Sequence, residues 1–395
     1  MQAPDTGLTT DLADLEAGQL YRSRRVVSRR EAGARVELDG RTLLNFCSND
    51  YLGLAGDQRI GEAMKAGVDR WGTGATAAHL VTGHTAAHHA LEEDLARVTG
   101  RDRALLFSTG YMANLGVFAA LAGRRDLIVE DRLNHASLLD AARLSGARVR
   151  RFRHADPAAA DARLSTGTHG RSFVVTDGVF SMDGDVAPLG ELSTVSSRHG
   201  AWLVVDDAHG FGVIGSDGTG SLSQAGLSQS DVPVLIATLG KAIGTFGAFV
   251  AGSEAVIETL IQRARTYIYT TAPPPAVAEA TRRALGIAFA ETWRRDRLVT
   301  LIKRLRRGAE RLGLAMTDSR SPIQPILLGE PGPALRASEA LFEKGFWVTA
   351  IRPPTVPEGS ARLRITLSAA HEEHDVDRLL DALADMDITG PQSDG

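Results

Sequence analysis

The sequence predicts an α/β protein with a mostly parallel central sheet sandwiched by helices, an N-terminal arm and a smaller C-terminal α+β domain. Between about residues 86 and 285, six short apolar runs alternate with helical stretches. Such runs between helices are typical of strands buried on both faces, as in parallel sheets. After residue 285 the pattern changes to amphipathic helices and an alternating strand, which indicates a second domain.

The apolar runs that we expect to form the central sheet are bounded by turn-forming residues. They are residues 103–107, 126–131, 171–178, 202–210, 232–241 and 247–252. Ahead of them, Leu91, Leu95 and Val98 recur at helical spacing, and Gly100 is the expected end of that helix. Residues 46–285 are therefore expected to make up the large domain.

The parts on either side of the large domain have different patterns. Residues 1–45 are expected to form the arm, with a short helix, a basic cluster and a hairpin around Asp39-Gly40. In the small domain, residues 286–395, we expect helices over 298–312 and 371–386 and strands over 323–329, 347–351 and 361–368. The last strand alternates strictly, which predicts a half-buried strand in a sheet with one open face. Residues 390–395 are expected to be disordered.

The composition argues against several classes of protein. The 395 residues carry a formal net charge of −4 without a block of like charges, which argues against nucleic acid or an anionic membrane as partner. The single cysteine, Cys47, can form neither an internal disulfide nor a multi-cysteine metal site, so we expect a reducing compartment and no bound metal. We find no signal peptide and no apolar run of about 20 residues, so a cytoplasmic enzyme is expected.

One glycine pattern resembles a dinucleotide-binding fingerprint. Gly210, Gly212 and Gly215 follow a strand at the right spacing. The fingerprint also requires a helix that begins at the glycines and an acidic residue about 20 positions later. Here residues 216–221 are a poor helix, and the acidic pair Asp206-Asp207 precedes the glycines. A nicotinamide dehydrogenase therefore remains only as an alternative to the enzyme class that the polar residues of the sheet favour.

Polar residues that suit pyridoxal phosphate follow successive strands of the predicted sheet. Such an enzyme needs a lysine for the aldehyde, a carboxylate for the pyridine nitrogen, phosphate donors and a group that lies flat on the ring. Lys241 is the last residue of the run 232–241. Asp206 and His209 lie in the second half of the run 202–210, where the strand is expected to end. Ser108 to Tyr111 open a helix, a common anion site, and His135 follows another strand. Each has an ordinary structural explanation alone, but together they predict this cofactor.

Several segments resemble the α-oxoamine synthases, which are fold-type I pyridoxal phosphate enzymes. The resemblance runs from about residue 20 to 388, and VVDDAHGFGVIG and TLGKAIGTFGAF are its most specific parts. The other matching segments are residues 45–56, 105–114, 131–141, 176–189, 267–276 and 347–371. The stretch 72–84 departs from the family pattern, because His79 stands where many members carry glycine or arginine.

The resemblance implies a role for each matching residue. Lys241 would hold the cofactor as a Schiff base, Asp206 would face the pyridine nitrogen, and His209 would bind the ring hydroxyl. His135 would stack on the ring, and these four would form the catalytic set. Further cofactor contacts would come from Gly110, Tyr111, Ser181 and Thr238, and from Thr270 or Thr271 reaching the neighbouring subunit. Substrate would meet Arg22, Asn49, Thr355 and Arg352, the last as the clamp for the amino-acid carboxylate.

The resemblance also implies a reaction. The segment 347–371 favours members that condense L-alanine with a pimeloyl thioester, carried by CoA or by an acyl carrier protein, with loss of carbon dioxide for biotin synthesis. Lys241 would act as the general base. The alternative within the family is a 2-amino-3-ketobutyrate ligase, which joins glycine to acetyl-CoA. A homodimer with shared active sites is expected.

Overall fold

The computed structural model describes residues 6–30, 34–167 and 170–386. The chain divides into two compact units. The first comprises Met1–Asn49, Met182–Gly184 and Arg297–Gly395, and the second comprises Asp50–Ser181 and Asp185–Asp296. The division into an arm, a large domain and a small domain at residues 45 and 285 stays a prediction; the contacts group the N-terminal segment with the C-terminal one.

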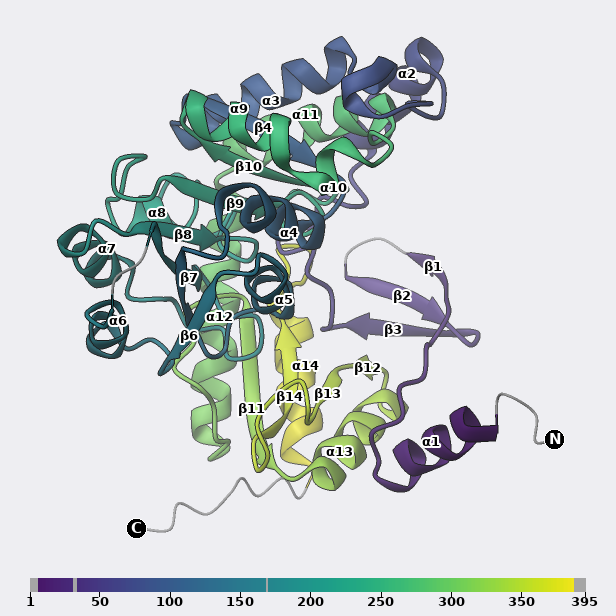
Figure 1. Cartoon of the computed structure of the whole chain (residues 1–395). Helices are drawn as coiled ribbons and strands as arrows, with labels where there is room; N and C mark the ends of the chain where they lie inside the picture. Colours follow the sequence, from purple (N-terminus) through teal and green to yellow (C-terminus); the bar gives the residue numbers. More distant parts are fainter. Residues whose placement is uncertain (1–5, 31–33, 168–169, 387–395) are drawn as a thin grey trace. The chain divides into compact units, whose positions relative to one another are not determined.

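The second unit is built on a seven-stranded sheet in the order β4-β10-β9-β8-β7-β5-β6 (Figure 1). Its strands are β4 (Arg103–Phe107), β5 (Leu127–Asp131), β6 (Arg148–Phe152), β7 (Ser172–Asp177), β8 (Trp202–Asp206), β9 (Val234–Thr238) and β10 (Ala248–Gly252). Only the two pairs that β10 forms, with β4 and β9, are antiparallel. This confirms the mostly parallel sheet. The sequence analysis missed β6, whose arginine-rich run RVRRF suits the edge position that it occupies.

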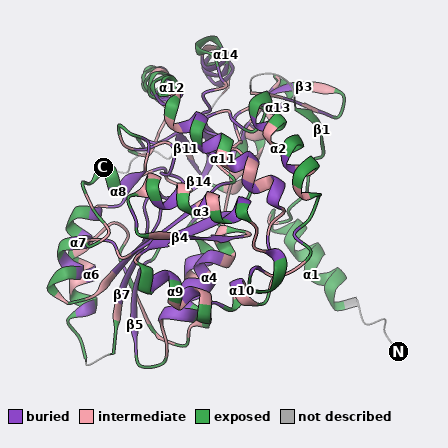
Figure 2. Ribbon diagram, turned by 90° about the horizontal axis from the view of Figure 1, so that it is seen from above, coloured by how far each residue is buried: buried purple, intermediate pink, exposed green. Residues whose placement is uncertain are grey.

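Helices cover both faces of this sheet. They are α2 (Gln58–Trp71), α3 (Ala86–Thr99), α4 (Gly110–Leu121), α5 (Ala136–Leu144), α6 (Pro157–Leu164), α7 (Leu189–Arg198), α8 (Ser221–Gln224), α9 (Glu254–Arg263), α10 (Arg265–Ile268), α11 (Pro275–Ala290) and the π-helix η1 (His79–Gly83). Side chains of α4, α5 and α9 share one apolar cluster with one face of the strands. Strand residues of the opposite parity, such as Leu106 and Val174, are equally buried, and the strands are drawn as buried in Figure 2.

The direction of the strands fixes where polar loops gather. Because β10 alone is reversed, β4, β5, β7, β8 and β9 all end at one edge of the sheet. The register of the strands shows that these ends are level with one another. Ala248 pairs with both Phe107 and Thr238, and Asp177 pairs with Asp206. In α/β folds this edge is where ligands bind.

The first unit contains two smaller sheets. One has the order β1-β2-β3-β12 and the other β11-β14-β13. The strands are β1 (Val27–Arg30), β2 (Arg35–Leu38), β3 (Arg41–Asn45), β11 (Ile323–Gly329), β12 (Phe346–Trp347), β13 (Thr349–Ile351) and β14 (Ala361–Thr366), and the helices are α1 (Thr6–Ala17), α12 (Trp293–Arg311), α13 (Pro331–Glu343) and α14 (Glu373–Ala384). The β2–β3 hairpin turns at Asp39 and Gly40, as predicted, with φ of 52° and 73°.

Two expectations for the small domain are wrong, and one lies outside the structure. Strand β14 is buried along its whole length, not half-buried, because its polar positions also have protein partners. Arg362 pairs with Asp183, and Arg364 with Asn49. The expected strand 347–351 is split between two sheets, since β12 pairs with β3 and β13 with β14. Residues 390–395 lie outside the described residues. Within the described ranges, every helix is too short or too polar to cross a bilayer.

A pair of glycines tests the packing of α2 on α11. A β-carbon on Gly67 would lie 2.8 Å from the Cα atom of Ala276, whereas one on Gly286, an exposed position of α11, would meet no atom within 4 Å. Alanine favours a helix at both sites. We expect Gly67→Ala to lower the free energy of unfolding by about 1–3 kcal/mol through overpacking, and Gly286→Ala to raise it by about 0.5–1 kcal/mol. Urea unfolding of both variants measures this; shifts of the same sign would contradict the packing.

Candidate active site

The predicted catalytic residues come after three strands, β5, β8 and β9, that end at the same edge of the large sheet. Asp206 is the last residue of β8, and His209 follows it in the turn. Lys241 comes three residues after β9 ends at Thr238. His135 follows β5 and is the N-cap of α5. The structure thus places all four in the second unit, with their backbones at the carboxyl ends of parallel strands.

Lys241 contacts His209 directly. Its Nζ atom lies 2.7 Å from His209 Nε2, and His209 Nδ1 lies 2.7 Å from the hydroxyl of Tyr51. His209 and Tyr51 are both buried, so the imidazole is held at both nitrogens. The sequence analysis placed Tyr51 only within a matching segment and gave it no role. This chain of contacts fixes the lysine amine and gives a proton a route away from it.

A second network links Asp206 to His135. Asn114, in α4, donates from Nδ2 to Asp206 Oδ2 and to Ser137 Oγ, both at 2.8 Å. Ser137 Oγ lies 2.7 Å from His135 Nδ1, which also accepts from the Ser137 backbone N–H at 3.3 Å. Because Nδ1 is the acceptor, a neutral His135 carries its proton on Nε2. Surrounding protein lowers the pKa of His135 by desolvation, which favours that neutral form.

Asp177 stands beside Asp206 in register at the end of β7. Its Oδ2 accepts from the backbone N–H of His135 at 2.7 Å. Burial, and then the negative charge of Asp206, raises the pKa of Asp177 well above its usual range. Asp206 receives donors at both oxygens, from Asn114 and from the backbone N–H of Ala208 at 3.0 Å. The N–H donors are thus directed at Asp206, while burial disfavours a charge on Asp177.

The N-terminus of α4 offers backbone donors for an anion. Thr109 caps the helix by accepting from the N–H of Met112 at 3.2 Å. The remaining first-turn N–H groups, those of Gly110 and Tyr111, have no intrahelical partner in such a geometry. No atom lies within 4 Å of the place where a β-carbon on Gly110 would stand, so a ligand can approach the backbone. The Tyr111 hydroxyl is turned toward Asp140.

The other predicted cofactor contacts also lie in the second unit. Thr238 ends β9 and donates from its hydroxyl to the carbonyl of Gly247 at 3.0 Å. Ser181 follows β7 and is half-buried. Thr270 and Thr271 follow α10, and Thr271 is exposed. Their reach toward a neighbouring subunit stays a prediction.

The structure does not form the dinucleotide fingerprint. After Gly210, Gly212 and Gly215 the chain makes turns, and the next helix, α8, begins only at Ser221 and is four residues long. No helix N-terminus therefore meets these glycines, as the sequence indicated.

Three of the predicted substrate residues line one cavity in the first unit. Arg22, Arg352 and Thr355 lie on its wall, and its volume is about 620 Å³. Arg352 donates from Nη2 to the carbonyl of Tyr21 at 2.7 Å. Burial, and then the neighbouring charge of Arg22, lowers the pKa of Arg352. The lining also includes Arg25, Glu16 and Glu339, so three guanidinium groups and two carboxylates face this cavity, and the excess of positive charge favours an anionic ligand.

The fourth predicted substrate residue, Asn49, lies elsewhere in the first unit. Its Oδ1 atom lies 3.4 and 3.3 Å from Nη1 and Nη2 of Arg364, so one amide oxygen faces both ends of the guanidinium. Arg364 is only 8% exposed. The sequence analysis assigned Arg364 to the polar side of a strand and missed it as a candidate. Its pairing with Asn49 across more than 300 positions is visible only in the fold.

The polar groups of the second unit fit pyridoxal phosphate. An amine, a carboxyl group that accepts N–H donors at both oxygens, a histidine at the amine and open helix N–H groups match the aldehyde, pyridine nitrogen, hydroxyl and phosphate of that cofactor. One observation points specifically to a missing polar partner: Asn114 Oδ1 is buried beside Asp206 without a hydrogen bond among the described residues. A native protein rarely leaves such an atom unsatisfied.

Comparisons with known proteins agree with this site. Among curated relatives, the 8-amino-7-oxononanoate synthase of Methylococcus capsulatus is 61% identical over 374 residues, covering 95% of this chain and 96% of the relative. The protein of the same name from Thioalkalivibrio sulfidiphilus is 59% identical over 389 residues, covering 98% and 99%.

The family model and the solved structures lead to the same family. A serine palmitoyltransferase variant from S. paucimobilis, with a bound pyridoxal phosphate–myriocin aldimine, superposes with a TM-score of 0.91 at 28% identity, covering 96% of each chain. This likeness confirms the fold-type I architecture predicted from the sequence. The family model described as aminotransferase class I and II matches residues 41–383. The chain therefore belongs to the class I and II aminotransferase family, within which 8-amino-7-oxononanoate synthases match it over nearly its full length.

Proposed function

We propose that this chain is a pyridoxal phosphate-dependent acyltransferase that condenses L-alanine with a pimeloyl thioester. The products are 8-amino-7-oxononanoate, the free thiol of the carrier and carbon dioxide, in biotin synthesis. The observation that carries the proposal is the Lys241–His209 contact at the sheet edge where Asp206 ends β8, in a chain whose relatives bear this enzyme's name. Those names favour this reaction over the glycine and acetyl-CoA alternative.

The residues of the second unit would hold the cofactor. Lys241 would bind it covalently, Asp206 would pair with its ring nitrogen, and His209 would face its hydroxyl. Its phosphate would meet the N–H groups of Gly110 and Tyr111, with Ser181 and Thr238 as further contacts. When bound, pyridoxal phosphate withdraws electrons from the substrate Cα through its protonated ring.

The chemistry of the chain's own groups follows from the two networks. Lys241 Nζ would remove the Cα proton of L-alanine as general base, and His209 holds that amine in place. Asp206, whose two oxygens accept from Asn114 and from the Ala208 N–H, would pair with the ring nitrogen and keep it protonated. His135 Nε2–H would donate to the thioester oxygen as negative charge develops there.

Two arginines are candidates for the clamp on the alanine carboxylate. Arg352 is the residue that the sequence favoured, and Arg364 is the one that the structure adds. Arg352 already donates to the Tyr21 carbonyl and shares a cavity with Arg22, which suits the larger acyl donor, together with Thr355. Arg364 is buried and paired with Asn49, which suits a small carboxylate.

We further propose that the enzyme works as a cytoplasmic homodimer. Thr270 or Thr271 would contact the cofactor phosphate of the neighbouring subunit, and the exposure of Thr271 supports this. The acyl carrier would be CoA or an acyl carrier protein.

A product assay tests the reaction and the role of Lys241 together. The purified holoenzyme should release carbon dioxide, CoA and the amino-oxo acid from L-alanine plus pimeloyl-CoA, identified by mass. Lys241→Ala should abolish turnover, because it removes both the covalent link and the base. The matched control is Lys65→Ala, since Lys65 is exposed and pairs only with nearby Glu62 among its described contacts. Turnover by Lys241→Ala with bound cofactor would refute the assignment, and product from glycine plus acetyl-CoA instead would move the function to the sister reaction.

The two neighbouring carboxyl groups should respond differently to neutralisation. Asp206→Asn removes the negative charge and should lower kcat about 100-fold or more. Burial, and then the charge of Asp206, raises the pKa of Asp177, so Asp177→Asn removes a group that is less suited to carry charge and should lower kcat less than about tenfold. Steady-state kinetics, with circular dichroism as the control for folding, measure both. An equal loss in the two variants would contradict these different roles of the two carboxyl groups.

Paired conservative substitutions separate the two arginines. We expect Arg364→Lys to raise the KM for L-alanine about tenfold or more, because lysine cannot form two parallel hydrogen bonds to a carboxylate. Arg352→Lys should instead raise the KM for pimeloyl-CoA and leave that for alanine within about threefold. The reverse pattern would show that Arg352, and not Arg364, binds the alanine carboxylate.

A further inference from the structure

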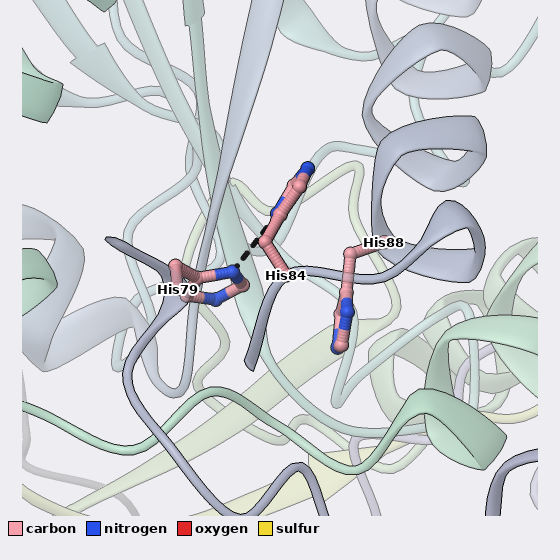
Figure 3. Close-up of side chains that lie close together, drawn as sticks. All are labelled: His79, His84 and His88. Atoms are coloured by element: carbon pink, nitrogen blue, oxygen red, sulfur yellow. Dashed lines mark hydrogen bonds between the residues drawn. The ribbon is translucent and has the colours of Figure 1, made fainter. Parts of the chain in front are cut away.

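Three histidines lie close together in the second unit, away from the catalytic residues in sequence and on other elements (Figure 3). His79 begins the π-helix η1, His84 follows its end, and His88 lies in the first turn of α3. One ring nitrogen of each lies within 4.8 Å of one from each of the other two. The sequence analysis named no metal ligands and noted only that His79 departs from the family pattern.

The closest contact in the cluster has the spacing of two metal ligands. His79 Nδ1 and His84 Nδ1 are 3.1 Å apart and share one proton, as the dashed line in Figure 3 marks. Two nitrogens at about 2.0–2.1 Å from a tetrahedral zinc ion lie about 3.3–3.4 Å from each other. An ion could therefore bind both Nδ1 atoms with little movement of either ring, while the shared proton moves to the Nε2 atom of the ring that carried it.

Two of the three outer nitrogens, those of His88 and His84, face groups of the kind that orient metal-binding histidines. His88 Nε2 donates to the carbonyl of Pro273 at 2.8 Å, so Nδ1 carries the lone pair. His84 Nε2 faces the buried carboxyl group of Glu92, 3.9 Å from Oε2. Ligating imidazoles typically direct their second nitrogen at a backbone carbonyl or a carboxylate.

The three rings are largely shielded from water. His79 and His88 are buried and His84 is half-buried, so an ion at this cluster would exchange little with solvent ligands. His79 Nε2 lacks a hydrogen bond among the described residues, so it is open to take the ring proton when an ion binds at Nδ1.

We propose that His79, His84 and His88 form a binding site for one divalent late transition-metal ion, of the class of Zn²⁺ or Co²⁺. In the structure His88 Nδ1 accepts from the N–H of Thr85 as part of a helix cap, and ion binding would exchange this bond for a metal bond. The site joins η1 and α3 to Pro273 through His88 and to Tyr267, which stacks on His79. An ion there would stiffen the segment that carries Thr270 and Thr271.

Titration of the metal-free holoenzyme with Co²⁺ tests the site. The expected result is one Co²⁺ per chain, with visible ligand-field bands of a tetrahedral nitrogen site, together with a rise in the thermal midpoint as Co²⁺ increases. His79→Gln and His84→Gln should each lose the bands and the rise, since glutamine keeps hydrogen bonding but is a poor ligand. Circular dichroism and bound pyridoxal phosphate show that each variant is folded, and neither readout depends on turnover.

His89→Ala is the matched control. His89 is on the same helix and could form a different set with His84 and Glu92, but it is exposed and is not one of the three ligands proposed. This variant should bind Co²⁺ with unchanged affinity. The proposal is overturned if the wild-type chain binds no Co²⁺, if folded His79→Gln and His84→Gln keep the bands, or if His89→Ala loses them.

Discussion

Asp177 and Asp206 end neighbouring strands in register, so two carboxyl groups are buried side by side. Two negative charges in such a place would repel each other and lose their hydration. Burial, and then the charge of Asp206, raises the pKa of Asp177, while Asn114 and the Ala208 N–H donate to the two oxygens of Asp206. Both oxygens of Asp206 therefore accept hydrogen bonds, as a carboxylate that faces a protonated pyridine ring requires.

The sheet topology also fixes the loop that carries Lys241. The loop after β9 folds back on the start of β10: Leu239 donates to the carbonyl of Gly247 and Thr245 to that of Leu239. Gly244, with φ of 73°, closes the turn by donating to the Lys241 carbonyl, and a β-carbon there would lie 2.6 Å from the backbone nitrogen of Ala55. A reversed strand between β4 and β9 thus fixes the lysine loop while leaving the parallel edge free for ligand.

Features carried by consecutive residues were predictable, and features carried by distant pairs were not. The continuous apolar runs of β4, β5, β7, β8 and β9 and the strand-end positions of Lys241 and Asp206 followed from the sequence. Strand β6 did not, because an edge strand can expose arginines, and β14 was misjudged because its arginines find partners in Asp183 and Asn49. Tyr51, Asn114 and Ser137 have ordinary sequence surroundings, and only the fold gives them contacts with the catalytic set.

The histidines show why residue type alone could not settle the chemistry. Burial lowers the pKa of His154, but the carboxylates of Asp131 and Asp185 outweigh it and raise that pKa to about 10, so this ring is a charged structural link. His79 is also buried, but its neighbours are other imidazoles and not carboxylates. Burial and these neighbours both lower the pKa of His79, which favours the neutral ring with a lone pair. His209 differs again, because its partners are an amine and a phenol. Whether a histidine forms an ion pair, binds a metal or carries a proton thus depends on neighbouring side chains from other helices and strands. The sequence alone does not specify those neighbours.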